Sequence, residues 1–174
     1  MKVSQRNVRE SAGKFADEVH PLLERIYCSR GVCTESELGR QLAELPSPSL
    51  LKGIDCAVDL LASALQNQRR ILIVGDFDAD GATSTALMML TLQAMGAFQV
   101  GYLVPNRFEY GYGLTPEIVE LAKTRTPDLI ITVDNGISSI EGVASARQAG
   151  IDVLITDHHL PGAELPNASA IVNP

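Results

Sequence analysis

Three aspartates that directly follow an apolar run are the clearest chemical signal in this sequence. Asp76, Asp78 and Asp80 come after the apolar residues 71–74 and Gly75. In an extended segment, side chains two residues apart fall on one side, so we expect the three carboxylates to face one another. No Lys or Arg lies among them, and bound cations would be needed to keep all three ionised. The segment therefore predicts a metal site; a polar surface turn, which Asp and Gly also favour, is the weaker alternative.

Two later motifs carry matching chemistry, Asp134-Asn135-Gly136 and Asp157-His158-His159. Carboxylates with imidazole suit Mn²⁺ well, whereas Mg²⁺ prefers oxygen ligands. Asp134 is our candidate for a carboxylate shared by two ions roughly 3.5 to 4 Å apart, the arrangement of two-metal hydrolases. We expect the rings of His158 and His159 to point to different sides of an extended turn, so that one binds metal and the other faces the substrate. A solvated surface turn is again the weaker alternative.

Strands and helices alternate from Arg69 onward, which predicts an α/β fold, a Rossmann-like parallel sheet with crossover helices. We expect strands at residues 71–75, 98–104, 129–133 and 153–156, and a short fifth strand at residues 171–172. Helices are expected at about residues 82–95, 115–123 and 138–149. Thr115 and Pro116 open the second of these as cap and first residue.

This topology would bring the motifs together, because ligands of open parallel sheets bind beyond the carboxyl ends of the strands. Pro105-Asn106-Arg107 follows the second strand, and the aspartate and histidine motifs follow the first, third and fourth. Five aspartates, two histidines and one arginine would then meet at one edge. The glycine patterns G-x-G-x-x-G and G-x-x-x-x-G-K-[ST] are both absent after the first strand, so we expect phosphate to bind through cations and not through backbone amides.

A helical arm at residues 1–68 is expected to precede the α/β domain at residues 69–174. Its first helix should span residues 15–30, shortened or kinked by Pro21. The capping-box pattern Thr34-Glu35-Ser36-Glu37 should start a short helix to about Leu42. Apolar residues at helical spacing predict an amphipathic helix at about residues 54–65, with its apolar face against the sheet.

Composition sets outer limits on function. The 174 residues carry a formal charge of −7, and 45% of them are hydrophobic. Taken alone, the acidic charge argues against non-specific binding of nucleic acid, which depends on Lys and Arg. Divalent ions in the expected metal site would cancel or reverse part of it locally. No apolar run approaches the roughly 18 residues of a membrane span, and no signal-peptide core follows the first residues, so we expect a cytoplasmic protein.

Four segments of the sequence resemble, in the same order, the RecJ family of bacterial 5′→3′ exonucleases specific for single-stranded DNA, within the DHH phosphoesterase superfamily. The segments are GDFDADGATST, VPNRFEYGYGL, TVDNGISS and TDHHLPG. The resemblance implies a two-metal phosphodiesterase of DNA repair and recombination that uses Mn²⁺ or Mg²⁺ and releases mononucleotides. It implies single-stranded DNA as substrate, with single-strand binding protein and a helicase as possible partners, and no membrane partner. Its metal ligands would be Asp78, Asp80, Asp134 and His158, with Asp76 as a support or further ligand.

The same resemblance makes His159 a phosphate-facing catalytic group and Asp157 its close support or a further ligand. Arg107 and Tyr112 would touch the DNA or its terminal phosphate. Tyr110 departs from the family, which has an aspartate there. Relatives continue with a further aspartate motif, a second catalytic domain and a domain for single-stranded DNA, so we expect this domain to be incomplete at its C-terminus. The 174-residue chain should then bind metal but show little or no processive nuclease activity.

Two alternatives stay open. Another DHH phosphoesterase would hydrolyse short oligonucleotides, cyclic dinucleotides or pyrophosphate. Enzymes that this alternative resembles usually have a histidine a few residues upstream of the first aspartates, where this chain has Val74 and Gly75. A non-catalytic relative would act as an interaction module, and it should have lost metal ligands. Every ligand expected within this span is present.

Overall fold

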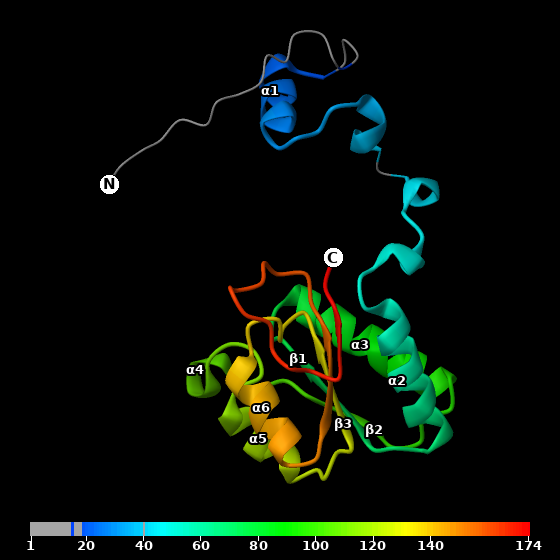
Figure 1. The fold of residues 1–174 in the computed structure, drawn as a ribbon, viewed down its shortest axis with the longest axis vertical. Helices are drawn as coiled ribbons and strands as arrows, with labels where there is room; N and C mark the ends of the chain where they lie inside the picture. Colours follow the sequence, from blue (N-terminus) through cyan, green and yellow to red (C-terminus); the bar gives the residue numbers. More distant parts are fainter. Residues whose placement is uncertain (1–14, 16–18, 40) are drawn as a thin grey trace. The chain divides into compact units, whose positions relative to one another are not determined.

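The computed structural model describes residue 15, residues 19–39 and residues 41–174 (Figure 1). The chain divides into two units, Met1–Pro46 and Ser47–Pro174. In the first unit, the described residues form helix α1 (Pro21–Ser29) and the short 3-10 helices η1 (Glu35–Leu38) and η2 (Leu42–Glu44). The part of the expected first helix at residues 16–18 lies outside the described residues. The expected division of the chain at residue 68/69 remains a prediction.

Local capping explains where the helices of the first unit begin. Helix α1 starts at Pro21, whose fixed φ and missing N–H suit the first helical position, and His20 Nδ1 accepts the Leu22 N–H at 3.2 Å. The expected start at residue 15 was therefore wrong for the residues described. The capping box at Thr34 is confirmed, but it opens a single 3-10 turn that ends at Leu38 instead of a helix to Leu42.

The second unit contains one parallel sheet of five strands in the order β2-β1-β3-β4-β5. The strands are β1 (Ile71–Gly75), β2 (Val100–Leu103), β3 (Leu129–Val133), β4 (Asp152–Thr156) and β5 (Ala170–Val172). The parallel α/β fold predicted from the sequence is thus confirmed. Strand β2 is shorter than expected at both ends, since the residues on either side of it are outside the ladder with β1.

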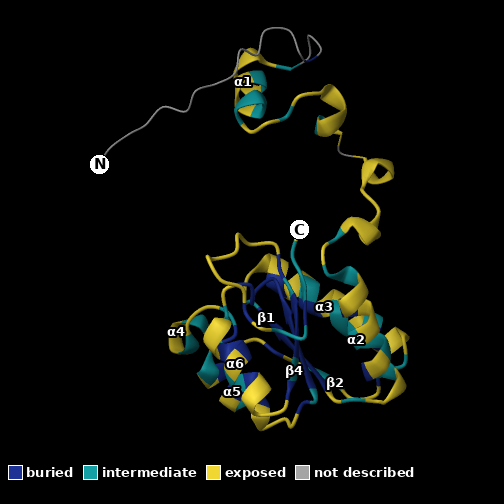
Figure 2. Cartoon of the chain, viewed as in Figure 1, coloured by how far each residue is buried: buried dark blue, intermediate teal, exposed yellow. Residues whose placement is uncertain are grey.

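Helices cover both faces of this sheet (Figures 1 and 2). Helices α2 (Ile54–Gln66) and α3 (Ala79–Ala94) pack with one set of strand residues, and α5 (Pro116–Lys123) and α6 (Ile140–Gln148) pack with the other. Within β1 the two sets alternate: Ile71 and Ile73 join α2 and α3, whereas Leu72 and Val74 face α5 and α6. Buried strands with apolar residues on both faces are expected of a sheet covered in this way.

Two smaller features complete the second unit: the 3-10 helix η3 (Pro48–Leu50) and the short helix α4 (Arg107–Tyr110). The sequence did not predict α4, which is capped by Asn106 through its side-chain acceptor for the Phe108 N–H. Helix α2 confirms the expected amphipathic helix, and Gly53 begins it with a left-handed backbone. In the described part of the chain, no helix is both long and apolar enough to cross a membrane.

Candidate metal centre

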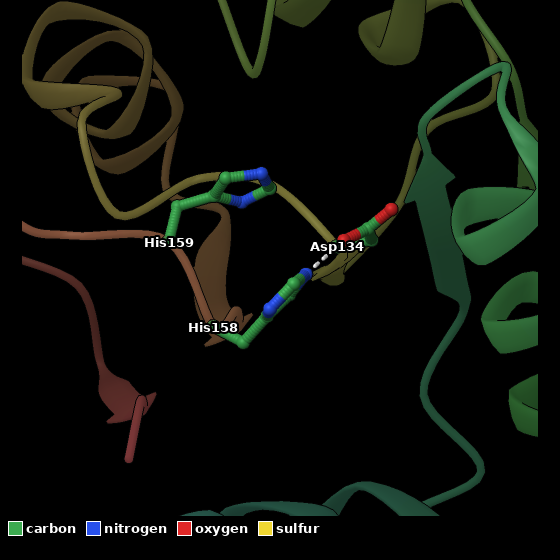
Figure 3. A group of neighbouring side chains, drawn as sticks. All are labelled: Asp134, His158 and His159. Carbon is green, nitrogen blue, oxygen red and sulfur yellow. Dashed lines mark hydrogen bonds and ion pairs between the residues drawn. The ribbon is translucent and has the colours of Figure 1, made fainter. Parts of the chain in front are cut away.

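The loops that follow β1, β2, β3 and β4 meet at the carboxyl edge of the sheet, as the parallel topology predicted. Side chains from different loops contact one another there. Arg107 Nη2 donates to Asp76 Oδ2 at 2.6 Å, and His158 Nε2 lies 3.0 Å from Asp134 Oδ1. The first contact joins the loops after β1 and β2, and the second joins those after β3 and β4 (Figure 3).

The loop after β1 turns into a helix earlier than the sequence suggested. Helix α3 begins at Ala79 and not near residue 82, because Asp78 is its N-cap and accepts the Gly81 N–H at 3.0 Å. The expectation of three carboxylates along one extended segment was therefore wrong: Asp80 lies within the first helical turn. Gly81 permits this close turn, since a Cβ there would overlap the backbone of Asp76.

Asp134 occupies an unusual backbone position at the end of β3. Its φ of 61° is left-handed, a region that residues other than Gly adopt at a cost, Asn and Asp least so. The backbone N–H donates to the Thr156 carbonyl at 3.0 Å, which holds the turn against β4. The residue is 8% exposed. Burial, opposed by the His158 hydrogen bond and assisted by the nearby Asp78 charge, raises the pKa of the Asp134 carboxyl.

Two groups of possible metal ligands share Asp134. One comprises Asp76, Asp78 and Asp134, and the other comprises Asp134, His158 and His159. Within each group the ligand atoms lie within 4.8 Å of one another. One carboxylate common to two ligand groups is what a bridge between two ions requires, and carboxylates with imidazole fit Mn²⁺ better than a thiolate metal. The side chains present therefore fit the implied cation chemistry.

Asp80 belongs to neither group in the described residues, although it borders the same space. A cavity of about 290 Å³ is lined by Asp80, Ser84, Asp134, Thr156, Asp157 and His158. The role of Asp80 as a metal ligand stays a prediction.

The rings of His158 and His159 lie next to each other. Their ring centroids are 4.7 Å apart with an interplanar angle of 41°, so the rings do not point to opposite sides of the turn (Figure 3). His158 approaches Asp134, whereas His159 Nδ1 lies 2.7 Å from Asp157 Oδ1. The hydrogen bond with Asp157 raises the pKa of His159.

Asp157 supports both histidines through its carboxylate. Its Oδ1 accepts the backbone N–H groups of His158 and His159 at 2.7 and 3.1 Å, and Oδ2 accepts the Ile137 N–H at 2.9 Å. Burial opposes ionisation of this carboxyl, but these hydrogen bonds and the His159 ring outweigh it and hold its pKa below the usual value. The geometry suits the supporting role that the sequence offered as one option for Asp157.

Arg107 and Tyr112 border the site, Arg107 at Asp76 and Tyr112 at His159 and the Asp134 carbonyl. The Arg107 guanidinium lies over the Tyr112 ring at 4.9 Å, and the Tyr112 hydroxyl lies 3.2 Å from His159 Nδ1. Burial and the charges of Asp157, Asp76 and Asp134 raise the pKa of Tyr112 to about 12, so the phenol stays protonated near neutral pH. Beside Tyr112 and His159, a cavity of about 470 Å³ extends toward the starts of α5 and α6.

Sequence reasoning missed two residues at this site. The phenyl ring of Phe77 lies under the Arg107 guanidinium at 4.4 Å, and Asn135 is buried between β1 and β3. The Asn135 side-chain amide donates to the Val74 and Val133 carbonyls at 3.1 and 2.9 Å, which ties the carboxyl ends of the two strands together. Both residues sit inside recognised motifs, next to Asp76 and Asp134, and that adjacency was the available signal.

Comparison with known proteins finds a matching family model and relatives that cover nearly the whole chain. Residues 70–174 match the model of the DHH family, N-terminal domain. The chain is 54% identical to the single-stranded-DNA-specific exonuclease RecJ of Salmonella typhimurium over 99% of its own length and 30% of the relative's. Against RecJ of Bacillus subtilis the identity is 39%, over 98% of this chain and 22% of the relative. The chain thus spans less than a third of these curated relatives.

Solved structures show the same similarity. A crystal structure of exonuclease RecJ bound to manganese matches with a TM-score of 0.67 and 40% identity, over 77% of this chain and 33% of that one. RecJ from Thermus thermophilus in complex with Mn²⁺ matches with a TM-score of 0.64 and 36% identity, over 90% of this chain and 22% of that one.

Proposed function

Because this chain belongs to the DHH family, whose N-terminal domain it contains, we propose that it forms the metal-dependent phosphodiesterase domain of a 5′→3′ exonuclease specific for single-stranded DNA. The observation that carries the proposal is the position of Asp134 in two groups of side chains that could hold a metal ion at the carboxyl edge of the sheet. The similarity to RecJ proteins supports single-stranded DNA as the substrate.

In this proposal Asp76, Asp78, Asp80, Asp134 and His158 hold two Mn²⁺ or Mg²⁺ ions. Once bound, the ions would activate a water nucleophile and stabilise the leaving oxygen. Structures of RecJ with bound manganese support the choice of metal.

The remaining site residues act through hydrogen bonds of their own. Asp157 fixes the His159 ring through Nδ1, which leaves Nε2 free to face a phosphate oxygen or a departing group. When protonated, this ring donates a hydrogen bond through Nε2 to an anionic phosphate. Arg107 and Tyr112 border the same space and would contact the DNA strand or its terminal phosphate.

The proposed function also implies partners and a place of action in the cell. A single-strand exonuclease needs strands that have been unwound, so a helicase and single-strand binding protein are the expected partners. The enzyme would work in the cytoplasm in DNA repair and recombination, with no membrane partner.

A chimera in which these 174 residues replace the matching part of the Salmonella relative tests the proposal. We expect it to degrade long single strands from the 5′ end to mononucleotides with Mn²⁺, and to lose this activity with EDTA or with Asp134→Asn. Faster hydrolysis of dinucleotides than of long strands would favour another DHH phosphoesterase. A chimera that binds Mn²⁺ yet hydrolyses neither substrate would contradict the proposed function.

A further inference from the structure

The Arg107 guanidinium is held on three sides. Its central carbon lies 4.4 Å from the centroid of the Phe77 ring and 4.9 Å from that of Tyr112. In addition, Nη2 donates to Asp76 Oδ2 at 2.6 Å. Arginine is well suited to such a position, because its planar cation stacks on aromatic faces while its edge donates hydrogen bonds.

Two nitrogens of the Arg107 guanidinium make no hydrogen bond within the described residues. Nε is buried and has no hydrogen-bond partner within the described residues, and Nη1 makes no hydrogen bond there either. Arg107 also borders a small cavity lined by Gly75, Asp76, Pro105, Gly111, Gly113 and Asn135. Two rings and one carboxylate therefore fix the plane of the guanidinium, and Nη1 remains available for an acceptor from outside the chain.

The Phe77 ring contacts the Arg107 guanidinium and stays partly exposed to solvent. Its side chain is 51% exposed and belongs to neither of the two hydrophobic core clusters of the second unit. The backbone explains why it faces Arg107: the Phe77 N–H donates to Asp76 Oδ1 at 2.8 Å, so the ring and the Asp76 carboxylate lie in one tight turn. The Phe77 ring therefore packs on the Arg107 cation and not in the core, and this contact is the observation that connects it with the site.

We infer that Phe77 is a positioning residue, which holds the Arg107 guanidinium in the orientation that binds a phosphate of single-stranded DNA. The phosphate ligand rests on the proposed function; the stacking of Phe77 on Arg107 does not. A free arginine side chain loses rotamer freedom when it binds, and a stacked one has lost much of it beforehand, so affinity rises without a new contact to the ligand. Phe77 thus acts on DNA binding through Arg107.

A spectroscopic test addresses the stacking directly and needs no activity. In ¹⁵N-resolved NMR spectra of the 174-residue chain, the Arg107 Nε–H resonance should carry ring-current shifts and exchange slowly with water. Arg107→Gln identifies the resonance by its loss. We expect Phe77→Leu to move it toward the free-arginine position and to speed its exchange, and Phe77→Tyr to retain both properties.

Phe108→Leu is the matched control. Phe108 is adjacent to Arg107 in sequence and 94% exposed, and within the described residues it has no stacking contact with a ring or a cation. It should leave the Arg107 resonance in place. An Arg107 resonance that is the same in Phe77→Leu as in the unmutated chain would overturn the inference.

The effect of Phe77 on DNA binding is tested by fluorescence anisotropy with the 174-residue chain and Mn²⁺. The probe is a 5′-phosphorylated single-stranded oligonucleotide with phosphorothioate linkages. Phe77→Leu should weaken binding roughly three- to tenfold, whereas Phe77→Tyr should restore it. In the Arg107→Gln background, Phe77→Leu should have no further effect, because the ring acts through the arginine.

The other outcomes of the binding test each count against the inference. An equal loss from Phe77→Leu in both backgrounds would mean that the ring contacts DNA itself. Binding that Arg107→Gln leaves unchanged would remove the phosphate role of Arg107 and with it the role of Phe77. The metal-based function would still stand in that case if the chain binds Mn²⁺ saturably, so the two failures are distinguishable.

Discussion

Asp134 and His158 are joined across the carboxyl ends of β3 and β4, with Asp134 Oδ1 3.0 Å from His158 Nε2. Because Asp134 belongs to both ligand groups, its loss should disrupt both. We expect Asp134→Asn to weaken Mn²⁺ binding by about tenfold or more in calorimetric titrations, since the amide cannot bridge as an anion. Asp59→Asn, an exposed change on α2, should leave the titration unchanged. Equal Mn²⁺ affinity in both variants would rule out Asp134 as a shared ligand.

The left-handed backbone of Asp134 makes a separate prediction about stability. Ala at φ 61° meets a steric penalty of about 1 to 2 kcal/mol that Gly does not. We therefore expect Asp134→Gly to be at least as stable as Asp134→Ala toward urea, the reverse of the order at an ordinary position. An alanine variant that is clearly more stable than the glycine variant would show that this turn relaxes out of the left-handed region.

Gly142 sets how closely α6 approaches the segment before α5. A Cβ at this position would overlap the Leu114 carbonyl oxygen, which is backbone and cannot rotate away. We expect Gly142→Ala to lower the free energy of unfolding by about 1 to 3 kcal/mol, although alanine favours helix by about 1 kcal/mol. Gly101→Ala on β2, where the added Cβ meets nothing within 4 Å, is the control and should not destabilise. A neutral effect of Gly142→Ala would mean that the two segments separate without cost.

Asp128 and Arg70 should make stability depend on pH at the edge of the sheet opposite the metal site. Arg70 hydrogen bonds, from both side chain and backbone, lower the pKa of Asp128 from 3.8 to about 2. The lowered pKa means that the stabilisation is present above about pH 4 and is lost as the pH falls through about 2. The side chains are 36% and 45% exposed, so we expect only about 0.5 to 1 kcal/mol.

Urea unfolding of the unmutated chain and of Asp128→Asn between pH 2 and pH 6 measures this contribution. The difference between the two should be largest near pH 6 and shrink toward pH 2. A difference that stays constant over this range would assign the effect to something other than ionisation of Asp128.

The sheet was predictable because its strands are short apolar runs with turn residues after them. Residues 71–75 and 129–133 need no tertiary information to be identified as buried strands, and the parallel arrangement followed from the helices between them. The strand order was not predictable in the same way, since any of several orders buries the same runs. The sequence pattern places the start of α3 too late, because an extended turn through Asp78 leaves out the capping role of its side chain.

The site was predictable as a set of residues but not as a geometry. Asp134 and His158 could be placed at one edge of the sheet, because each directly follows a strand predicted to be parallel. Their direct contact depends on β3 and β4 being neighbours, which the sequence did not predict. The packing of His159 against His158 depends on how Asp157 orients the turn, and the position of Phe77 depends on where the loop after β2 places Arg107. Neither relationship leaves a periodic trace in the sequence.

The left-handed Gly53 that begins α2 lies against the carbonyl of Ile171 in β5, and a side chain at residue 53 would collide with it. The start of α2 is therefore packed against β5, a strand made more than a hundred residues later in synthesis. During synthesis α2 can pack on side chains of β1 such as Ile73 before β5 exists, but its contacts with β5 can form only after β5 has been made. The packing of α2 should accordingly be finished late during translation, with the part of its apolar face that contacts β5 exposed in the interval.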